Sequence, residues 1–469
     1  MRNIAVLPVI LAGLLMLAGC SDGSSGSSER TSVPLTDIRV LHAVSDAPSV
    51  SVNFNGETLV MDASFKQAAA ITPESGDYSV EVNAQLPDDD ESTVSSVGNT
   101  RFDAGARYDV IATGLVSESI SPLILTDSGE RESENSARLR VVHLSPAAED
   151  AATEVSVYLT ADGAALPSEP DFSLALRETV GPLELGAGTY QIRVTPKDST
   201  NVVYDSGPID LPAASDLLIA AIDNTVKGDS PISLLVVDGS ESSEILDKDS
   251  GAGFRAVHNS SAPTPNVDIY LNVDPNASPA VGGVSYTQTV PGAATTGNYV
   301  EVAVGDTRIA VTPELAISPI AIDATLTLAN GDLRTVIAAG ELASGLDVLV
   351  FADDNRRIAT EAKLRILHGA VEAQVVDVFL VPAASAGNNQ GDAEPVLNDF
   401  EYGESSGYLS VSEGDYVVFI TSADGASVLF KSGTIRLLAN GVYTAVARLA
   451  TLAETGVAGL TLLDDFVTP

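Results

Sequence analysis

The sequence predicts an all-β fold, organised as four tandem antiparallel β-sandwiches. The chain of 469 residues is too long for one ordinary hydrophobic core and suggests three or four domains. Hydrophobic residues make up 45% of it and aromatic residues only 5%, and short apolar runs alternate with Gly, Pro, Asn, Asp and Ser clusters, which is typical of strands and turns. One short pattern also recurs four times, which indicates a repeated unit.

The recurring pattern is an apolar strand that ends in histidine. Its copies read IRVLHAVSDAPSVSVNF, LRVVHLSPAAEDAATEVSVYL, FRAVHNSSAPTPNVDIYL and LRILHGAVEAQVVDVFL. The whole chain contains four histidines, spaced 101, 115 and 110 residues apart, so each occupies the same position of its copy. These histidines are His42, His143, His258 and His368.

A Gly-x-Tyr motif before an alternating strand marks each copy a second time. We expect the glycine to adopt a positive φ at the turn into the strand. We expect the tyrosine ring to fill the end of the sandwich while its hydroxyl bonds a neighbouring loop, as in a tyrosine corner. The four motifs are Gly76/Tyr78, Gly188/Tyr190, Gly297/Tyr299 and Gly414/Tyr416.

An apolar strand that ends in aspartate closes each copy. The aspartates are Asp127, Asp238, Asp353 and Asp464. The three ordered landmarks place the repeated units at 34–130, 131–247, 248–358 and 359–469.

The first copy illustrates the strands expected in one unit. SFKQAAAI is expected to form at most one helical turn. About 100 residues with this rhythm predict a Greek-key sandwich of the immunoglobulin-like or prealbumin-like type. The expected strands lie near 37–44, 49–54, 57–63, 77–84, 107–114 and 121–126.

The histidine of each copy has three possible roles. Ile38, Val40 and His42 share one strand face, so the histidine ends a core-facing stripe and is interpreted as a neutral scaffold residue. Contact with a ligand is the first alternative, and a metal or catalytic role is the second. With one histidine per unit and no His-x-His or Glu-x-x-His spacing, the residues offer few of the ligands that zinc needs. We therefore predict no metal, no cofactor and no catalytic residue.

An arginine recurs three residues before each histidine and points to the opposite face of the strand. In so acidic a chain we expect each arginine to pair with a cross-strand carboxylate, and the terminal aspartates are candidate partners. Such pairs are worth little if exposed. The four arginines are Arg39, Arg140, Arg255 and Arg365.

The net charge of −40 limits the classes of partner. Such a surface repels nucleic acids, so nucleic-acid binding is not expected. The charge indicates a solvated exterior suited to salty surroundings, and a basic partner or divalent cations are the alternative. LPDDDES at 86–92 is interpreted as a solvated acidic turn, with calcium binding as the alternative.

The N-terminus predicts an export signal. Arg2 precedes an apolar stretch of 14 residues, Ile4–Leu17, which is short for a membrane span. Leu17-Ala18-Gly19-Cys20 resembles a bacterial lipobox, which implies a signal peptide at 1–19 and a diacylglycerol on Cys20. Cys20 is the single cysteine, so no disulfide can form within the chain. An ordinary signal peptide with an incidental cysteine is the alternative.

The Ser/Gly-rich segment 20–33 is expected to be a flexible tether. Ser21 resembles an outer-membrane sorting signal, whereas Asp22 weighs against that signal. We therefore expect a cell-envelope protein, anchored by lipid in the outer membrane and facing the periplasm or the cell surface.

LRVVHLSP, VSVYL and the Gly-x-Tyr strand together resemble the bacterial domain of unknown function 4397. The copy with DAPSVSVNFNG fits that pattern best, whereas the second copy has a longer insert and the fourth lacks the proline. The resemblance covers nearly all of 35–466 and implies a tandem extracytoplasmic β-domain. It implies no activity.

Three classes of function are compatible with these features of the sequence. A non-enzymatic structural, adhesive or interaction array is expected, because no copy of the unit carries a specialised catalytic motif. A glycan-binding or other ligand-binding envelope module is the alternative, although the chain has no tryptophan for a sugar platform. An envelope enzyme is the third possibility. The membrane, through the lipid, is the expected partner, with an envelope protein or glycan as a further one.

Overall fold

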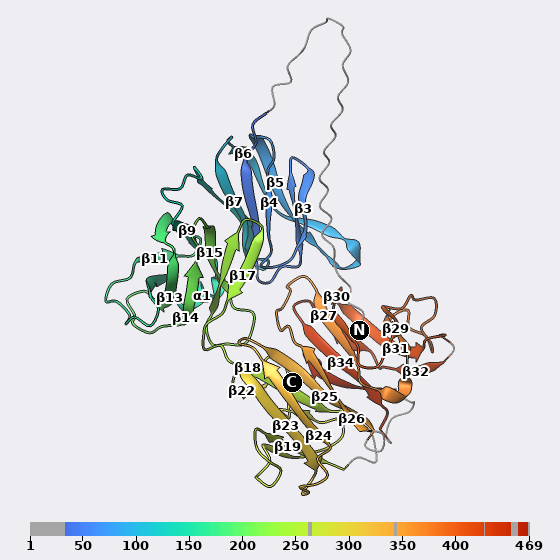
Figure 1. Ribbon diagram of the computed structural model, residues 1–469. Coiled ribbons are helices and arrows are strands. Elements are labelled where there is room, and N and C mark those ends of the chain that lie inside the picture. The colour runs from blue at the N-terminus through green and yellow to red at the C-terminus, as the bar shows by residue number, and fades with distance from the viewer. Residues whose placement is uncertain (1–32, 261–264, 342–344, 426, 452–457, 468–469) are drawn as a thin grey trace, which may run out of the picture.

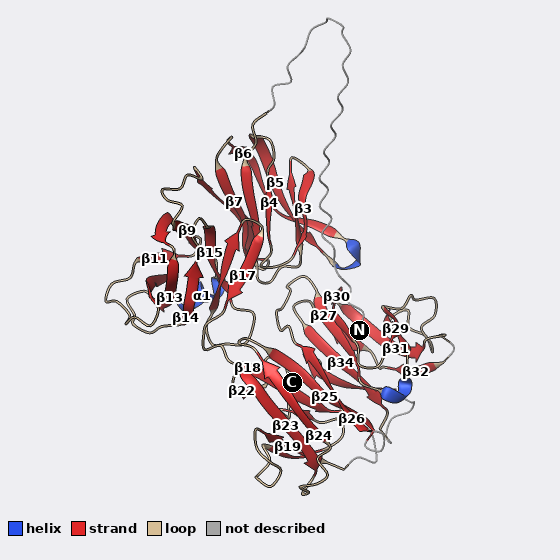
Figure 2. Ribbon diagram, viewed as in Figure 1, coloured by secondary structure: helices blue, strands red, loops and turns tan. Residues whose placement is uncertain are grey.

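The computed structural model describes residues 33–260, 265–341, 345–425, 427–451 and 458–467, and strands dominate these ranges (Figures 1 and 2). They form eight sheets that pair into sandwiches, each with its own hydrophobic core. The predicted all-β sandwich fold is therefore confirmed.

The predicted N-terminal features fall outside the described part of the chain. The signal peptide at 1–19, Cys20 and the tether up to residue 32 are not described. Among the residues that are described, no helix is long and apolar enough to cross a membrane. The lipid anchor stays a prediction.

The first and second sandwiches lie next to each other (Figure 1). The first contains β1 (Asp37–His42), β2 (Val50–Phe54), β3 (Glu57–Ala63), β4 (Ala68–Ile71), β5 (Gly76–Gln85), the 3₁₀ turn η1 (Pro87–Asp89), β6 (Glu91–Phe102), β7 (Arg107–Leu115) and β8 (Ser119–Asp127). The second contains β9 (Ser136–His143), α1 (Pro146–Ala151), β10 (Glu154–Ala161), β11 (Phe172–Ala175), β12 (Thr179–Gly186), β13 (Gly188–Pro196), β14 (Tyr204–Leu211), β15 (Asp216–Asp223), β16 (Ile232–Asp238) and β17 (Glu241–Ile245).

The third and fourth sandwiches also lie together (Figure 1). The third contains β18 (Ala252–His258), β19 (Val267–Leu271), β20 (Val281–Val284), β21 (Thr289–Val290), β22 (Val300–Val302), β23 (Gly305–Pro313), β24 (Ile322–Leu328), β25 (Leu333–Glu341) and β26 (Gly345–Ala352). The fourth contains β27 (Ala362–His368), the 3₁₀ turn η2 (Val371–Ala373), β28 (Val376–Pro382), β29 (Leu397–Phe400), β30 (Ser405–Val411), β31 (Gly414–Ser422), β32 (Val428–Lys431), β33 (Ile435–Leu437), β34 (Val442–Leu449) and β35 (Ala458–Asp464). The predicted unit boundaries fall between these sets of strands and stay predictions.

The four sandwiches share one strand plan. In the first, one sheet has the order β4-β1-β7-β8 and the other has β3-β2-β5-β6. Neighbours run antiparallel except β1 and β7, which are parallel, as are β9 and β15, β18 and β25, and β27 and β34. The order differs from the immunoglobulin arrangement of sheets ABED and CFG. Of the two predicted types of sandwich, immunoglobulin-like and prealbumin-like, the prealbumin-like type therefore remains.

Three local expectations need correction. The segment SFKQAAAI forms strand β4 rather than a helical turn, because residues 68–71 pair with β1. The strand β6 was not expected, because its sequence ESTVSSVGNTRF is mostly polar; it is held by pairing with β5. The insert after the second histidine contains α1, which Ser145 caps by accepting a hydrogen bond from the Ala148 N–H.

The sheets that carry the histidine strands stack face to face in pairs. The outer face of the sheet with β1 packs on the outer face of the sheet with β9 through a shared apolar cluster that includes Leu41, Ile111, Leu144 and Leu218. A second shared cluster, with Val257, Ile337, Leu367 and Val446, joins the third sandwich to the fourth. We call these units the first pair and the second pair; each is four sheets thick. Because β9 is covered on both sides, all of its residues are buried, including Arg138 and Arg140 on the face that meets the first sandwich.

The two pairs also touch each other. Nη1 of Arg356, which lies between the third and fourth sandwiches, donates to the carbonyls of Ser45 at 3.2 Å and Ala47 at 2.8 Å. The N–H of Ala359 donates to the carbonyl of Asp46 at 2.8 Å. The linker between the third and fourth sandwiches therefore docks on the loop after β1.

The face-to-face stacking predicts that its residues behave as core. Leu41 is 1% exposed, so Leu41→Ala is expected to lower the free energy of unfolding by about 2–5 kcal/mol, as in a true core. Met61→Ala is the control, because Met61 is 75% exposed, and we expect it to change the free energy of unfolding by less than about 0.5 kcal/mol. Urea denaturation measures both. Equal effects of the two substitutions would contradict the stacking.

Candidate functional site

His42 holds the segment that crosses from one sheet of the first sandwich to the other. We call the segment between the histidine strand and the next strand the arch. The ring Nε2 lies 3.0 Å from the Pro48 carbonyl, and the Val44 N–H donates to Nδ1 over 3.3 Å. Because Nδ1 accepts, Nε2 must carry the proton and donate to Pro48. A neutral ring thus ties both ends of the arch.

The other histidines occupy the same position. His368 repeats the pattern, with Nε2 2.8 Å from the Gln374 carbonyl and Nδ1 accepting from the Ala370 N–H at 3.3 Å. Nδ1 of His143 accepts from the Ser145 N–H at 3.4 Å. His258 is 4% exposed, and its ring meets the Tyr286 ring edge-on at a centroid distance of 6.2 Å.

Burial governs the charge of these rings. It lowers the pKa of all four histidines, and it lowers the pKa of His42 to about 4. All four are at most 4% exposed, so each is neutral at pH 7 and shielded from solvent. The geometry supports the scaffold interpretation.

The tyrosines of three Gly-x-Tyr motifs make one shared contact. Each hydroxyl donates to the carbonyl four residues earlier, at 2.7 Å for Tyr78 and 2.8 Å for Tyr190 and Tyr416. The expected positive φ of the glycine is wrong for these three copies. The tyrosine ring explains the glycine instead, because a Cβ on Gly414 would lie 2.9 Å from the Tyr416 ring.

The third motif, Gly297/Tyr299, does not sit at the equivalent place. Tyr299 precedes β22. The strand of the third sandwich that is equivalent to β5 is β23, as its pairing shows. This strand begins with Gly305 and has Thr307 where the other copies have tyrosine. The Tyr299 hydroxyl donates to Asp353 at 2.7 Å. Its ring also stacks on the Arg255 guanidinium, 5.2 Å from the centroid. Tyr299 thus serves the interface between sandwiches.

Charged residues meet inside the second pair. Arg255 of the third sandwich donates to both carboxylate oxygens of Asp464 of the fourth, at 2.5 and 3.0 Å. In return, Arg365 of the fourth approaches Asp353 of the third at 2.7 Å. None of the four side chains is more than 1% exposed. The exchange is reciprocal, as in an isologous dimer interface.

The first pair contains the same exchange in altered form. Arg140 of the second sandwich contacts Asp127 of the first at 3.1 Å. Arg39 donates to the Val237 carbonyl at 3.0 Å, while exposed Asp238 makes no ion pair among the described residues. The carboxylate that replaces it is Asp109, which is the register neighbour of Arg39 and pairs with it at 2.7 Å.

The expected pairing of the arginines with the terminal aspartates is therefore correct for three aspartates. The stacking of the sandwiches buries these pairs, so they are not the exposed pairs that would contribute little to stability. Burial opposes the charged form of Arg255, yet its hydrogen bond to Asp464 and the nearby Asp353 raise its pKa above the usual value. The pKa of Asp353 is lowered in spite of burial, chiefly by Arg365 and Arg255.

Polar side chains also join the arches within each pair. The Asp223 carboxylate accepts from the hydroxyls of Ser45 and Ser145, both at 2.5 Å, and so connects the first and second arches. In the second pair, the Asn259 amide donates to the Gly369 carbonyl at 2.9 Å. His42 and His368 thus hold arches that contact the arch of the neighbouring sandwich in the same pair.

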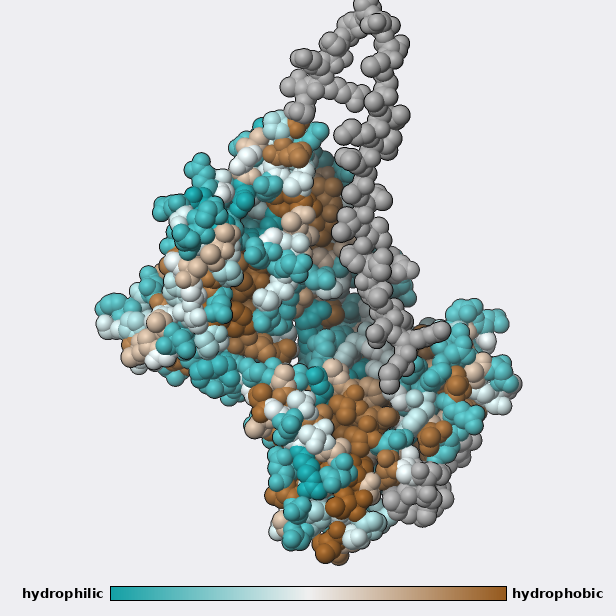
Figure 3. All heavy atoms as spheres, in the orientation of Figure 1, coloured by the Kyte–Doolittle hydropathy of each residue, from teal (hydrophilic) through white to brown (hydrophobic). Residues whose placement is uncertain are grey.

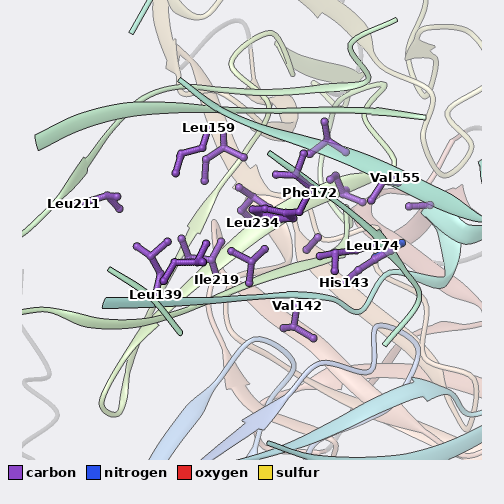
Figure 4. A pocket seen from close by; sticks show the side chains of 18 residues that line it. Leu139, Val142, His143, Val155, Leu159, Phe172, Leu174, Leu211, Ile219 and Leu234 are labelled. Atoms are coloured by element: carbon purple, nitrogen blue, oxygen red, sulfur yellow. The ribbon is translucent and has the colours of Figure 1, made fainter. Parts of the chain in front are cut away.

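A small cavity lies in the core of the second sandwich (Figure 4). Its volume is about 30 Å³, and apolar side chains such as Leu139, Phe172 and Leu234 surround it, with His143 at its edge. It has no room for an organic ligand.

Two polar clefts are larger. One, of about 370 Å³, opens between the first and second sandwiches beside Arg39, Arg107 and Asp216. The other, of about 560 Å³, lies between the pairs beside Asp223 and Arg356. Among the described residues, no group of three or more His, Cys, Asp or Glu side chains is placed to hold a metal ion.

Sequence reasoning missed several residues of the interface. Arg138 pairs with Asp127 at 2.7 Å and with Asp216 at 3.0 Å. The available signal was its spacing, because Arg138 lies two residues before Arg140 and so faces the same way. No repeated mark identified Asp216 or Asp223.

The buried histidines predict a pH dependence of stability. Because folding depresses the pKa of His42 from 6.5 to about 4, its contribution is complete above pH 6.5 and is lost as the pH falls towards 4, on the order of 3 kcal/mol. His42→Phe is expected to flatten this part of the curve of unfolding free energy against pH. Denaturant unfolding from pH 8 to pH 4 measures it, and parallel curves for the two proteins would refute the assignment.

The buried ion pairs predict an asymmetric mutational effect. Asp464→Asn removes the carboxylate that Arg255 binds through two hydrogen bonds and leaves it only Asp353, at 3.4 Å. We expect this substitution to lower the free energy of unfolding by about 3–5 kcal/mol, whereas Arg255→Met with Asp464→Leu recovers most of that loss. Asp323→Asn, at the exposed pair with Arg308, is the matched control and should leave thermal unfolding unchanged. A double variant no more stable than the single one would contradict the account.

Comparison with known families adds one finding. A model of a family described as a domain of unknown function, DUF4397, matches residues 36–158 and 252–379. No curated protein matches the chain. The first match covers the first sandwich and continues through β9 and β10, and the second covers the third sandwich and continues into β28. The two matches span more than half of the sequence, so the chain belongs to the DUF4397 family.

Proposed function

We propose that the chain is a lipid-anchored cell-envelope protein with a non-enzymatic structural, adhesive or interaction role. The observation that carries the proposal is the use of the repeated charged residues. Three of the repeated arginines and three of the terminal aspartates bind one another between stacked sandwiches, where they fix the geometry of the interface.

This arrangement supports a rigid assembly of sandwiches rather than domains that move independently on flexible linkers. To turn one sandwich against its neighbour would expose the apolar clusters around Leu218 and Ile337 and separate buried charges. Each pair therefore moves as one body. A rigid body presents its loops at fixed distances, which suits an adhesive or scaffolding protein.

The location rests on the sequence. The apolar stretch and the LAGC tetrapeptide before Ser21 support lipidation of Cys20, and the tether 20–33 joins the lipid to the first sandwich. The outer membrane is the proposed site. An envelope protein is the proposed partner, and glycan binding is the alternative, which the absence of tryptophan disfavours.

The proposed lipid anchor predicts that the protein leaves the membrane when the sulfur atom of Cys20 is replaced by oxygen. Cys20→Ser replaces the sulfur that would carry lipid, so the protein should lose incorporation of labelled palmitate and leave the membrane fraction of bacterial cells. Cys20→Ser with Ser24→Cys is the control, because it keeps a cysteine but moves it out of the lipobox. Retention of label by either variant would exclude lipidation at Cys20.

The role of the anchored protein is tested in the same cells. Cells that lack the chain, and cells with Cys20→Ser, should attach less to surfaces than cells with the full chain, and cross-linking in intact cells should recover a discrete envelope partner. Unchanged attachment together with no cross-linked partner would count against the interaction role.

A further inference from the structure

The loop between β23 and β24 of the third sandwich exposes aliphatic side chains. Leu315 is 95% exposed, Ile317 65% and Ile320 42%. No charged residue lies between Leu315 and Ile322 in this segment, whose sequence is LAISPIAI. Three large apolar side chains therefore stand in water within six positions, an arrangement that marks a binding surface when it is contiguous.

The equivalent loops of the other sandwiches are different. The loop after β5 reads LPDDD, the loop after β13 reads KDSTNVV, and the loop after β31 reads ADGAS. The apolar loop is thus a special feature of the third copy and is not required by the strand plan.

The backbone of this loop is held in place. The Leu315 N–H donates to the buried Asp268 carboxylate at 2.9 Å, and the Glu314 N–H donates to the Asn266 carbonyl at 2.7 Å. The Ala316 N–H donates to Pro313 at 3.0 Å. Leu315 also has a φ of +60°, a region that a leucine rarely adopts. The fold therefore keeps Leu315 exposed against its backbone preference, as is typical of functional positions.

Figure 1 places β23 and β24 at the end of the molecule far from the first sandwich, and Figure 3 shows brown, hydrophobic atoms at that extremity. The loop is therefore free to meet a surface that the rest of the molecule does not touch.

We propose that the β23–β24 loop of the third sandwich inserts into the interface of a lipid bilayer with neutral headgroups. The inference goes beyond the proposed function and does not depend on lipidation of Cys20. A bilayer requires backbone groups that already have partners, and the first turn of this loop meets that requirement.

Two observations favour lipid over an apolar socket in a protein. The large exposed side chains of the loop are all aliphatic, and the loop lacks the tryptophan, tyrosine or arginine anchors that dominate protein hot spots. Its flexibility is also restricted by the Asp268 contact, so the side chains need no induced fit. The net charge of −40 disfavours anionic headgroups, which selects neutral ones.

The absence of tryptophan makes the test direct, because one introduced tryptophan is the sole indole emitter of the chain. Ile317→Trp in the full chain is mixed with vesicles of phosphatidylcholine, with and without brominated acyl chains. We expect the emission to shift to shorter wavelength and the brominated lipid to quench most of it. Val304→Trp is the matched control, because Val304 is 52% exposed just before the start of β23, at the far end of that strand from the loop, and we expect no quenching there.

A second variant separates insertion from folding. Leu315→Asn, in the Ile317→Trp background, places a residue that tolerates positive φ at this position, so the melting temperature should hold or rise while quenching is lost. Absence of quenching at residue 317, or equal quenching at 304, would overturn the proposal. A blue shift that grows with protein concentration without vesicles would assign the loop to a second copy instead, and stronger quenching in anionic vesicles would refute the choice of neutral headgroups.

The outcome is separable from the fate of the lipid anchor. Cys20→Ser changes how firmly the whole chain stays on vesicles, whereas the depth of the tryptophan reports the loop alone. Quenching at residue 317 that persists in Cys20→Ser supports the loop even if the anchor proposal fails.

Discussion

The reciprocal exchange of arginine and aspartate between stacked sandwiches is the interaction on which the architecture depends. Arg255 reaches Asp464 of the neighbouring sandwich, and Arg365 reaches Asp353 in the opposite direction. Four charges buried to this extent are tolerable only when they meet, because an isolated one has no water to solvate it. The exchange therefore fixes one register of the two sheets, while the surrounding apolar clusters supply most of the stabilisation.

A single strand organises both the inside of a sandwich and its contact with the next. Because side chains alternate along a strand, His42 faces the core of its own sandwich and Arg39 faces the neighbouring sandwich. The histidine then ties the arch, and the arches of a pair bind each other through Asp223 or Asn259. Whether a residue stands at an odd or an even position along the strand, its parity, thus decides whether it faces the core of its own sandwich or the neighbouring sandwich.

That parity was readable from the sequence, and so were the landmarks at the ends of each copy. The histidines and the arginines could be assigned to opposite faces of their strand because they repeat in phase, and the terminal aspartates could be named as candidate partners of the arginines. The partner sandwich could not be assigned, because nothing in a strand pattern says whether its second face meets water or protein. The motif at Tyr299 was assigned to the wrong position for a related reason. A Gly-x-Tyr motif in a loop cannot be told by sequence from one at the start of a strand. The strand pairing shows that Thr307 holds the position equivalent to the tyrosines of the other copies.

The first pair shows what the interface tolerates when a copy diverges. Asp238 has left the exchange, and Asp109, which lies beside Arg39 on β7, supplies the missing carboxylate from within the same sandwich. Arg39 still donates to the carbonyl of Val237, just as Arg140 donates to Thr126 and Arg365 to Ala352, the residue before each terminal aspartate. The hydrogen bond from the arginine to this carbonyl fixes how the two stacked sheets approach each other, and the carboxylate only has to neutralise the charge of the arginine.

The family matches are longer than one sandwich and shorter than a pair. Each match begins at the first strand of one sandwich and ends on the second strand of the next, so it includes two histidines, two arches and two arginines that meet across one interface. The loop with Leu315 lies outside these contacts, and there the third copy differs from the others by exposing large aliphatic side chains.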